Sequence, residues 1–268
     1  MTVKHSAHNG GYIKAVLLSG FLLCFILISV KGLYAEEPLP LATRSSIPPY
    51  VYGPASSGME IDLLNAIFKE MKLRVKYVQL PRVRMVQSFN RGEMKGILTQ
   101  APSVSGVGCA ADWYIEHRNV GFSLQENNIQ LHRLHDLKSL SVISFDGATL
   151  YLGPAFKAAV SNNSRYTESR NQQSHIDLLY KKRFDVVVGD EWILRLAQRR
   201  IFDQTGGKQA LTVHNIMKPA LYSARFHEKS LCERFNTALA HLRSSGDYDA
   251  ILEGYHLRIN VAIAPTSK

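Results

Sequence analysis

The sequence lacks the patterns that mark most catalytic and metal centres. It contains no G-x-S-x-G and no H-E-x-x-H motif, which excludes the nucleophile elbow of the α/β-hydrolases and the zinc-binding helix of the metalloproteases. His132 and His135 have the spacing of a ligand pair, but no third ligand accompanies them, so we expect surface histidines. We therefore expect no bound metal and no cofactor.

Long runs of like charge are also missing. Lysine and arginine number 32 against 22 acidic residues, for a formal net charge of +10, but the basic residues are scattered. Basic pairs such as Lys181-Lys182 have no aromatic residues interleaved with them. A nucleic-acid groove is therefore not expected, and the charge indicates a solvated basic surface.

One long apolar run is present, over residues 15–30. Lys4 and Lys14 precede it, and Lys31 and the small residue Ala35 follow it. This is the order of a secretory signal. We predict cleavage after Ala35 and delivery of residues 36–268 to the periplasm, with a permanent membrane anchor as the alternative, because about 16 apolar residues approach the lower limit for a span.

Cysteine is scarce, with three in the whole chain and only Cys109 and Cys232 after the predicted signal. Two cysteines do not make a disulfide scaffold. In an oxidising compartment they suit a single bridge, but sequence does not fix the distance between their Cα atoms. A disulfide and two free thiols both stay open.

Hydrophobic periodicity predicts alternating strands and helices. Leu64, Ile67, Phe68 and Met71 lie on one helical face, followed by an alternating strand pattern over residues 73–80. A second helix is expected from Pro81 to the residue before Gly92, and a short strand over 96–100 follows. The same order returns over residues 139–200, whereas residues 101–122 read as a long loop or several short elements.

This order predicts two α/β units, each built on a mostly parallel sheet, that meet at a crevice. In such folds ligands bind beyond the carboxyl ends of the strands. The polar residues expected at those ends are Arg44, Thr99, Gln100, Asp146, Thr149 and Asp190.

The chain resembles family 3 of the extracytoplasmic solute-binding proteins, the type II periplasmic binding proteins that serve amino-acid ABC transporters. The matching stretches are "IPPYVYG", "GMEIDLLNAIFKEMKLRVKYVQ", "MVQSFNRGEMKGILTQ", "HDLKSLSVISFDGAT", "RFDVVVGDEW" and "FNTALAHLRSSGDYDAILEGY". The resemblance implies an α/β fold of two lobes joined by two hinge crossings. Residues 36–126 and 213–268 would form lobe one and residues 127–212 lobe two, which close around a ligand.

The resemblance also implies roles for individual residues. Asp190 matches the acid that pairs with a ligand's α-amino group; alternatively, it caps the helix that follows it. Thr149 lies in the "FDGAT" turn, where a hydroxyl and backbone N–H groups receive a carboxylate. Thr99 and Gln100 would add contacts from lobe one, and Tyr50 would form a wall of the cleft.

The sequence departs from the amino-acid binders of this family at several positions. The threonine-rich turn and the arginine that clamp a ligand's carboxylate are missing after Gln100, and Arg118 is the nearest candidate for the arginine. Lys95 replaces an acid. Arg82 stands where an apolar residue is usual, and its guanidinium suits bidentate capture of carboxylate or phosphate. These departures put the standard α-amino-acid ligand in doubt.

We expect a monomeric periplasmic protein that captures a small polar or charged solute, either amino-acid-like or an organic anion. It would bind without catalysis and deliver the solute to a membrane permease or a sensor receptor. One alternative is an enzyme resembling cyclohexadienyl dehydratases, with Asp190 or Glu191 as general acid or base. The other is a sensory or interaction module with a degenerate cleft.

Overall fold

Five strands form the first sheet of the protein. They are β1 (Leu39–Arg44), β2 (Val75–Leu80), β3 (Gly96–Gln100), β4 (Cys109–His117) and β10 (Ala220–Phe226), and their order in the sheet is β2-β1-β3-β10-β4. β1 pairs in parallel with β2 and β3, and β10 pairs antiparallel with β3 and β4. The carboxyl ends of β1, β2 and β3 therefore lie at one edge of the sheet. The computed structural model describes residues 1–2, 37–54, 57–101, 106–207 and 209–260.

Three helices pack on this sheet, namely α2 (Met59–Glu70), α3 (Arg82–Asn90) and α8 (Lys229–Ser245). The predicted apolar face of α2 is buried, since Leu64 and Ile67 are 0% exposed. Pro81 lies at the N-cap of α3, as expected of a residue whose fixed φ suits a helix start. The two helices predicted in this half are confirmed.

The second sheet repeats the same arrangement with different residues. Its strands are β5 (Asn119–Leu124), β6 (Val142–Phe145), β7 (Tyr166–Ser169), β8 (Val186–Asp190) and β9 (Leu211–His214), in the order β7-β6-β8-β5-β9. β6 is parallel to β7 and β8, and β5 is antiparallel to β8 and β9. The predicted pair of α/β units is confirmed, with mixed sheets in which three neighbouring strands are parallel.

The helices of this half are α4 (Ala148–Tyr151), α5 (Pro154–Val160), α6 (His175–Tyr180) and α7 (Glu191–Thr205), with short 3-10 turns at Gln125–Asn127 (η2), Leu134–Ser139 (η3) and Gln172–Ser174 (η4). Because these helices cover both faces of the second sheet, they explain why three valines precede Asp190 in β8. Val187 belongs to one core cluster, while Val186 and Val188 belong to another, so both faces of β8 are covered.

The chain passes between the sheets at two places. Residue 118 joins β4 to β5, and residues 215–219 join β9 to β10. From the family resemblance, we expected the crossings near residues 126 and 213. That expectation placed β5 in the first lobe. The pairing of β5 with β8 and β9 contradicts that placement, because Val120, Phe122 and Leu124 of β5 pack in the second core.

Residues 101–122 were expected as a long loop or several short elements, but from residue 109 onward the chain forms the two strands β4 and β5. In β4 the residues Ala111, Ile115 and His117 are buried, and Ala110 and Asp112 are exposed. This alternation is typical of a strand covered on one face. The expectation for this segment was therefore wrong.

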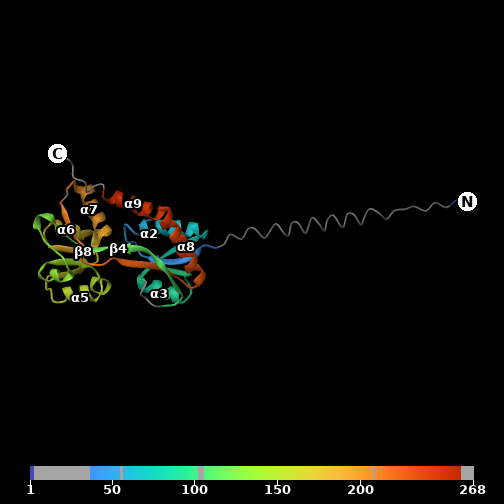
Figure 1. Cartoon of the computed structure of the whole chain (residues 1–268), viewed down its shortest axis with the longest axis horizontal. Coiled ribbons are helices and arrows are strands. Elements are labelled where there is room, and N and C mark those ends of the chain that lie inside the picture. Colours follow the sequence, from blue (N-terminus) through green and yellow to red (C-terminus); the bar gives the residue numbers. More distant parts are fainter. Residues whose placement is uncertain (3–36, 55–56, 102–105, 208, 261–268) are drawn as a thin grey trace. The chain divides into compact units, whose positions relative to one another are not determined.

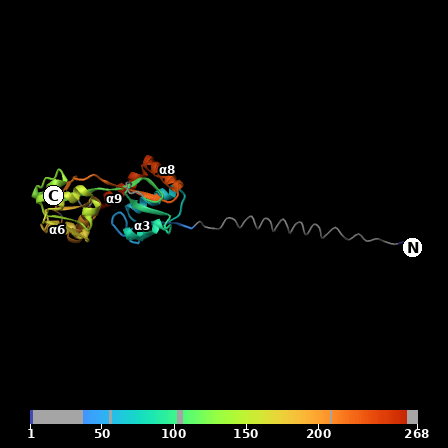
Figure 2. The same cartoon turned by 90° about the horizontal axis from the view of Figure 1, so that it is seen from below.

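The C-terminal helix α9 (Asp247–Asn260) packs against α2, α7 and α8 (Figures 1 and 2). The indole of Trp192 in α7 stacks on the imidazole of His256 in α9, with ring centroids 3.6 Å apart. α9 therefore contacts helices associated with both sheets.

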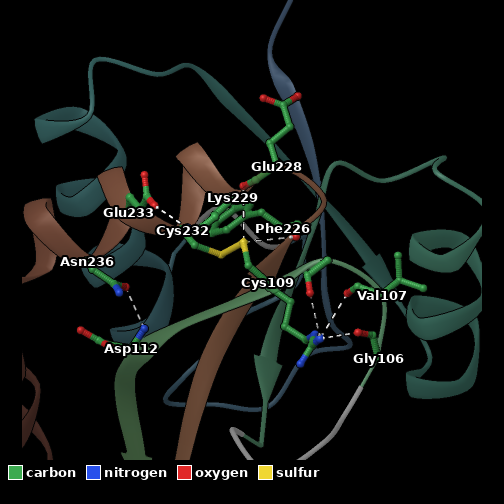
Figure 3. The surroundings of a disulfide bond; sticks show 12 residues. Gly106, Val107, Cys109, Asp112, Phe226, Glu228, Lys229, Cys232, Glu233 and Asn236 are labelled. Atoms are coloured by element: carbon green, nitrogen blue, oxygen red, sulfur yellow. Dashed lines mark hydrogen bonds and ion pairs between the residues drawn. A yellow bond between two sulfur atoms is a disulfide. The ribbon is translucent and has the colours of Figure 1, made fainter.

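A disulfide joins Cys109, the first residue of β4, to Cys232 in α8 (Figure 3). The Cα atoms are 6.4 Å apart, and 123 positions separate the residues in sequence. Close by, the Asp112 backbone N–H donates a 2.8 Å hydrogen bond to the Asn236 side chain. The bridge that the sequence left open therefore fastens α8 to an edge strand.

The predicted signal sequence, residues 1–35, lies outside the described residues except for the first two. Within the described ranges, no helix combines the length and hydrophobicity needed to cross a membrane.

Candidate functional site

Two arginines lie at the carboxyl edge of the first sheet. Arg44 ends β1 and is in register with Leu80, the last residue of β2. Arg82 follows Leu80 by two positions and begins α3. The parallel pairing of β1 and β2 thus brings two guanidinium groups to the place where ligands bind in open α/β sheets.

Asp190 ends β8 and caps α7. Its Oδ1 accepts hydrogen bonds from the backbone N–H groups of Trp192 at 3.0 Å and Ile193 at 3.1 Å. Its Oδ2 accepts a third hydrogen bond, of 2.9 Å, from the hydroxyl of Tyr50. The capping role that the sequence offered as an alternative is confirmed.

Burial controls the protonation of Asp190. The residue is 3% exposed, and desolvation raises its pKa to about 7 although the three hydrogen bonds act to lower it. Burial thus makes the neutral carboxylic acid more favourable at Asp190 than at an ordinary aspartate.

Tyr50 lies behind Asp190 and is not part of the pocket wall. It is 0% exposed, and its ring stacks on the His117 imidazole with centroids 3.9 Å apart. Burial, followed by the charge of Asp190, raises the pKa of Tyr50 well above its ordinary value, so its hydroxyl stays a donor.

The glycine turn before α4 holds a carboxylate of the protein itself. The backbone N–H groups of Gly147 and Thr149 donate to the two oxygens of Glu168, at 2.7 and 2.9 Å. The hydroxyl of Tyr166 donates a 2.8 Å hydrogen bond to the same group. Burial alone would raise the pKa of Glu168, but the hydrogen bonds, that from the Thr149 N–H foremost, bring it below the ordinary value.

Gly147 is required in this turn. It has φ 81°, and a Cβ added there would lie 2.8 Å from the ring of Tyr151. Its N–H reaches Glu168 in this left-handed conformation, which glycine adopts without the strain felt by other residues.

A pocket of about 60 Å³ lies between elements of the two sheets. Its polar lining residues are Arg44, Arg82, His117, Asn119, Gln172 and Asp190. Its apolar and aromatic lining residues are Ile47, Phe145, Tyr151, Leu152, Ile193 and Tyr222. An adjoining hollow of about 170 Å³ shares Ile47, Gln172 and Ile193 with the pocket.

The Arg82 guanidinium stacks on the ring of Tyr151 across this pocket, 4.7 Å from the ring centroid. Arg82 comes from α3 on the first sheet, and Tyr151 from α4 beside the second. A cation–π contact at an exposed site contributes about 0.5–1 kcal/mol, which is weak enough to open and close.

His117 adds a neutral polar group to the pocket. Burial, reinforced by the charges of Arg44 and Arg82, lowers the pKa of His117 well below its usual 6.5. Its Nε2 is buried and has no hydrogen-bond partner in the described parts of the chain.

Two of the predicted contacts point away from the pocket. The Thr99 hydroxyl donates a 2.6 Å hydrogen bond to the buried carboxylate of Glu60. The Gln100 side chain donates to the carbonyl of Leu98 at 2.8 Å. Neither residue lines the pocket, because the end of β3 turns both toward the first sheet's own interior and backbone.

Arg118 and Asp146 lie elsewhere as well. Arg118, in the crossing between β4 and β5, has its Nη1 3.4 Å from the Glu191 carboxylate, and its Nη2 donates to Asn215. Asp146 forms an exposed ion pair with Arg170 at 3.2 Å. Of the nine predicted ligand contacts, the structure brings together Arg44, Arg82 and Asp190 at the pocket.

The sequence interpretation missed the contributions of β4 and β10. His117 ends β4 and Tyr222 lies in β10, and their rings meet edge to face with centroids 4.8 Å apart. The alternation of buried and exposed residues along β4 was the signal that would have identified His117.

No group of three or more histidine, cysteine or acidic side chains suitable for a metal ion occurs among the residues that the structure describes.

No protein-family model matches the sequence, and a search of curated proteins gives no match. Solved structures do match. The GluR0 ligand-binding core in complex with L-glutamate has a TM-score of 0.63 at 18% identity, covering 82% of this chain and 99% of that chain. An ancestral cationic amino acid solute-binding protein has a TM-score of 0.62 at 19% identity, with 81% and 95% covered.

A histidine kinase sensor domain with similarity to periplasmic binding proteins also matches, with a TM-score of 0.60 at 16% identity, covering 82% of this chain and 96% of that chain. At these identities the likeness establishes the fold alone. The two-lobed fold expected from the sequence is thereby confirmed.

Proposed function

We propose that the protein binds a small polar or charged solute in the pocket between its two sheets and does not transform it. The observation that carries the proposal is the convergence of Arg44, Arg82 and Asp190 on one pocket whose walls come from both sheets. A pocket built in this way changes its contacts when the two halves move, which couples binding to closure.

We extend the proposal to export of the protein to the periplasm and to a membrane partner that receives the solute. A disulfide between Cys109 and Cys232 suits an oxidising compartment such as the periplasm. Among the similar structures are solute-binding proteins and a sensor domain, so either a membrane permease or a sensor receptor is a fitting partner.

The enzymatic alternative has less support. Asp190 is the one carboxylate among the residues that line the described pocket, and three hydrogen bonds already engage it. Glu191 is held by Arg195 at 2.7 Å and by Arg118 at 3.4 Å. A pKa near 7 suits acid–base chemistry, so formation of product from cyclic acids by the purified protein would favour the enzyme.

Thermal unfolding against a panel of small solutes tests the proposal. The panel should hold amino acids, polyamines, organic acids, phosphorylated metabolites and peptidoglycan fragments. A ligand at a hundred times its dissociation constant adds about 2.7 kcal/mol, which raises the unfolding midpoint by roughly 5–10 °C in a protein of this size. A selective shift supports solute binding, and no shift with any class contradicts it.

A further inference from the structure

The pocket holds an excess of positive charge. In the described parts of the chain, the side chains of Arg44 and Arg82 form no ion pair, and the Arg82 guanidinium stacks on the uncharged ring of Tyr151. The one acid of the lining, Asp190, is partly neutral near pH 7. Arg82 is exposed and Arg44 is half-buried, and two guanidinium groups at the mouth of one pocket favour an anion there.

The acid that would receive an ammonium group is already engaged. Asp190 accepts from Tyr50 on one oxygen and from the N–H groups of Trp192 and Ile193 on the other. Since a carboxylate oxygen can accept two hydrogen bonds, an ammonium group arriving there would have to share Oδ2 with the Tyr50 hydroxyl, which is wholly buried and fixed by its stack on His117.

The turn that would receive an amino acid's carboxylate is engaged too. Glu168 accepts from the N–H groups of Gly147 and Thr149, and Tyr166 adds a third hydrogen bond. The turn is thus occupied by a carboxylate of the protein, and Asp190 offers an ammonium group only a share of one oxygen.

A neutral donor completes the pocket. His117 lines the space together with Arg44 and Arg82, and its Nε2 is buried without a partner among the described residues. A neutral imidazole carries one N–H and so can donate to an anion without adding charge. The apolar half of the lining, including Phe145 and Ile193, suits an uncharged body on the ligand.

We propose that the ligand is a small organic anion that carries no ammonium group, with its charged end held by Arg44 and Arg82 and its uncharged body against the apolar wall. This inference rests on the proposed function and names the solute class of the same pocket. A carboxylate and a phosphate ester share the required chemistry, and the experiment distinguishes them.

The test compares matched compounds that differ in the amino group alone. Thermal unfolding and calorimetric titration of the purified full-length protein would use glutarate against L-glutamate, 4-methylpentanoate against L-leucine, and 3-phenylpropionate against L-phenylalanine. Simple alkyl phosphates form a separate arm. We expect at least one amine-free anion to bind about tenfold or more tightly than its amino-acid partner.

Two variants test whether the anion binds at Arg44 and Arg82. Arg82→Gln and Arg44→Gln should each weaken binding of that anion by about 10-fold to 100-fold, because each removes a charged hydrogen bond. Arg84→Gln is the matched control, since Arg84 is an exposed arginine of the same helix but does not line the pocket. It should leave the affinity within about twofold.

The outcomes separate this inference from the proposed function. Tighter binding of the amino acids than of their amine-free partners would overturn the inference and leave solute binding intact. An anion whose affinity is unchanged in Arg82→Gln and Arg44→Gln would overturn the assignment to this pocket. Failure of all these compounds, with binding of another class from the broader panel, would overturn the inference alone, whereas failure of the whole panel would contradict the proposed function as well.

Discussion

The hydroxyl of Tyr50 donates a 2.9 Å hydrogen bond to the carboxylate of Asp190. Tyr50 belongs to the core of the first sheet, whereas Asp190 ends β8 of the second. One buried contact therefore links the two halves directly behind the pocket and takes up the acid that an amino-acid ligand would need.

Removing this contact should reduce stability. Tyr50→Phe keeps the ring and its stack on His117 but leaves one oxygen of Asp190 without its donor. We expect a loss of about 1–3 kcal/mol, the usual effect of leaving a buried acceptor unpaired, measured as a lower midpoint in urea unfolding. Tyr77→Phe is the control, because the Tyr77 hydroxyl bonds to Asn65 at an exposed position. Equal effects of the two substitutions would contradict the structural role of the Tyr50 contact.

Binding of an anion should strengthen as pH falls from about 8 to about 6. Burial raises the pKa of Asp190 to about 7, so the residue is mostly ionised at pH 8 and mostly neutral at pH 6. An anion favours the neutral form and raises that pKa further. If binding raises it by one unit, affinity improves by up to about tenfold across this range.

The other groups near Asp190 do not reverse this sign. His117 is neutral throughout, since burial holds its pKa well below 6.5. Tyr50 keeps its proton because burial raises its pKa. Calorimetry at pH 6 and pH 8 with a fully ionised carboxylate checks the prediction, and Asp190→Asn should remove the dependence. Tighter binding of this carboxylate at pH 8 would contradict the prediction.

Gly147→Ala should weaken binding through Tyr151. The added Cβ would lie 2.8 Å from the Tyr151 ring, and a shift of that ring would disturb its stack with Arg82. Backbone strain at φ 81° adds a stability loss of about 1 kcal/mol. Gly153→Ala is a matched control, with φ 88° and no neighbour near its Cβ. It should reduce stability alone, and equal affinities of the two variants for the bound anion would contradict the role of Tyr151.

Replacing both cysteines should lower stability without changing the pocket. The bridge closes a long loop between Cys109 and Cys232, and loss of a native disulfide typically reduces the free energy of unfolding by about 2–5 kcal/mol. We expect the Cys109→Ser, Cys232→Ser double variant to unfold at a clearly lower midpoint and to keep its ligand affinity at 25 °C. An unchanged midpoint would show that the bridge does not form in solution.

Local patterns in the sequence were enough to predict the two α/β units. The helical face of Leu64 and Ile67 and the valine run before Asp190 follow from burial on one side or on both sides of an element. The strand at Cys109–His117 was missed because its alternation is interrupted by Tyr114, a buried aromatic residue directly before the buried Ile115. That error also displaced the first crossing between the sheets.

The site was predictable where strand ends alone determine it. Arg44 and Asp190 end parallel strands, so topology brings them to the pocket. The partners of Thr149 and Asp190 were not predictable, because the approach of Glu168 and Tyr50 depends on packing between segments distant in sequence. The positive φ of 55° at Thr99, which accompanies its turn away from the pocket, had no sequence signal either.

A crystal structure of the protein with the anion that binds most tightly would test this interpretation most directly. We expect the anionic oxygens within hydrogen-bond distance of Arg44 and Arg82, with Glu168 still bound to the N–H groups of Gly147 and Thr149. A ligand whose carboxylate has displaced Glu168 from that turn, or whose ammonium group has displaced Tyr50 from Asp190, would contradict it.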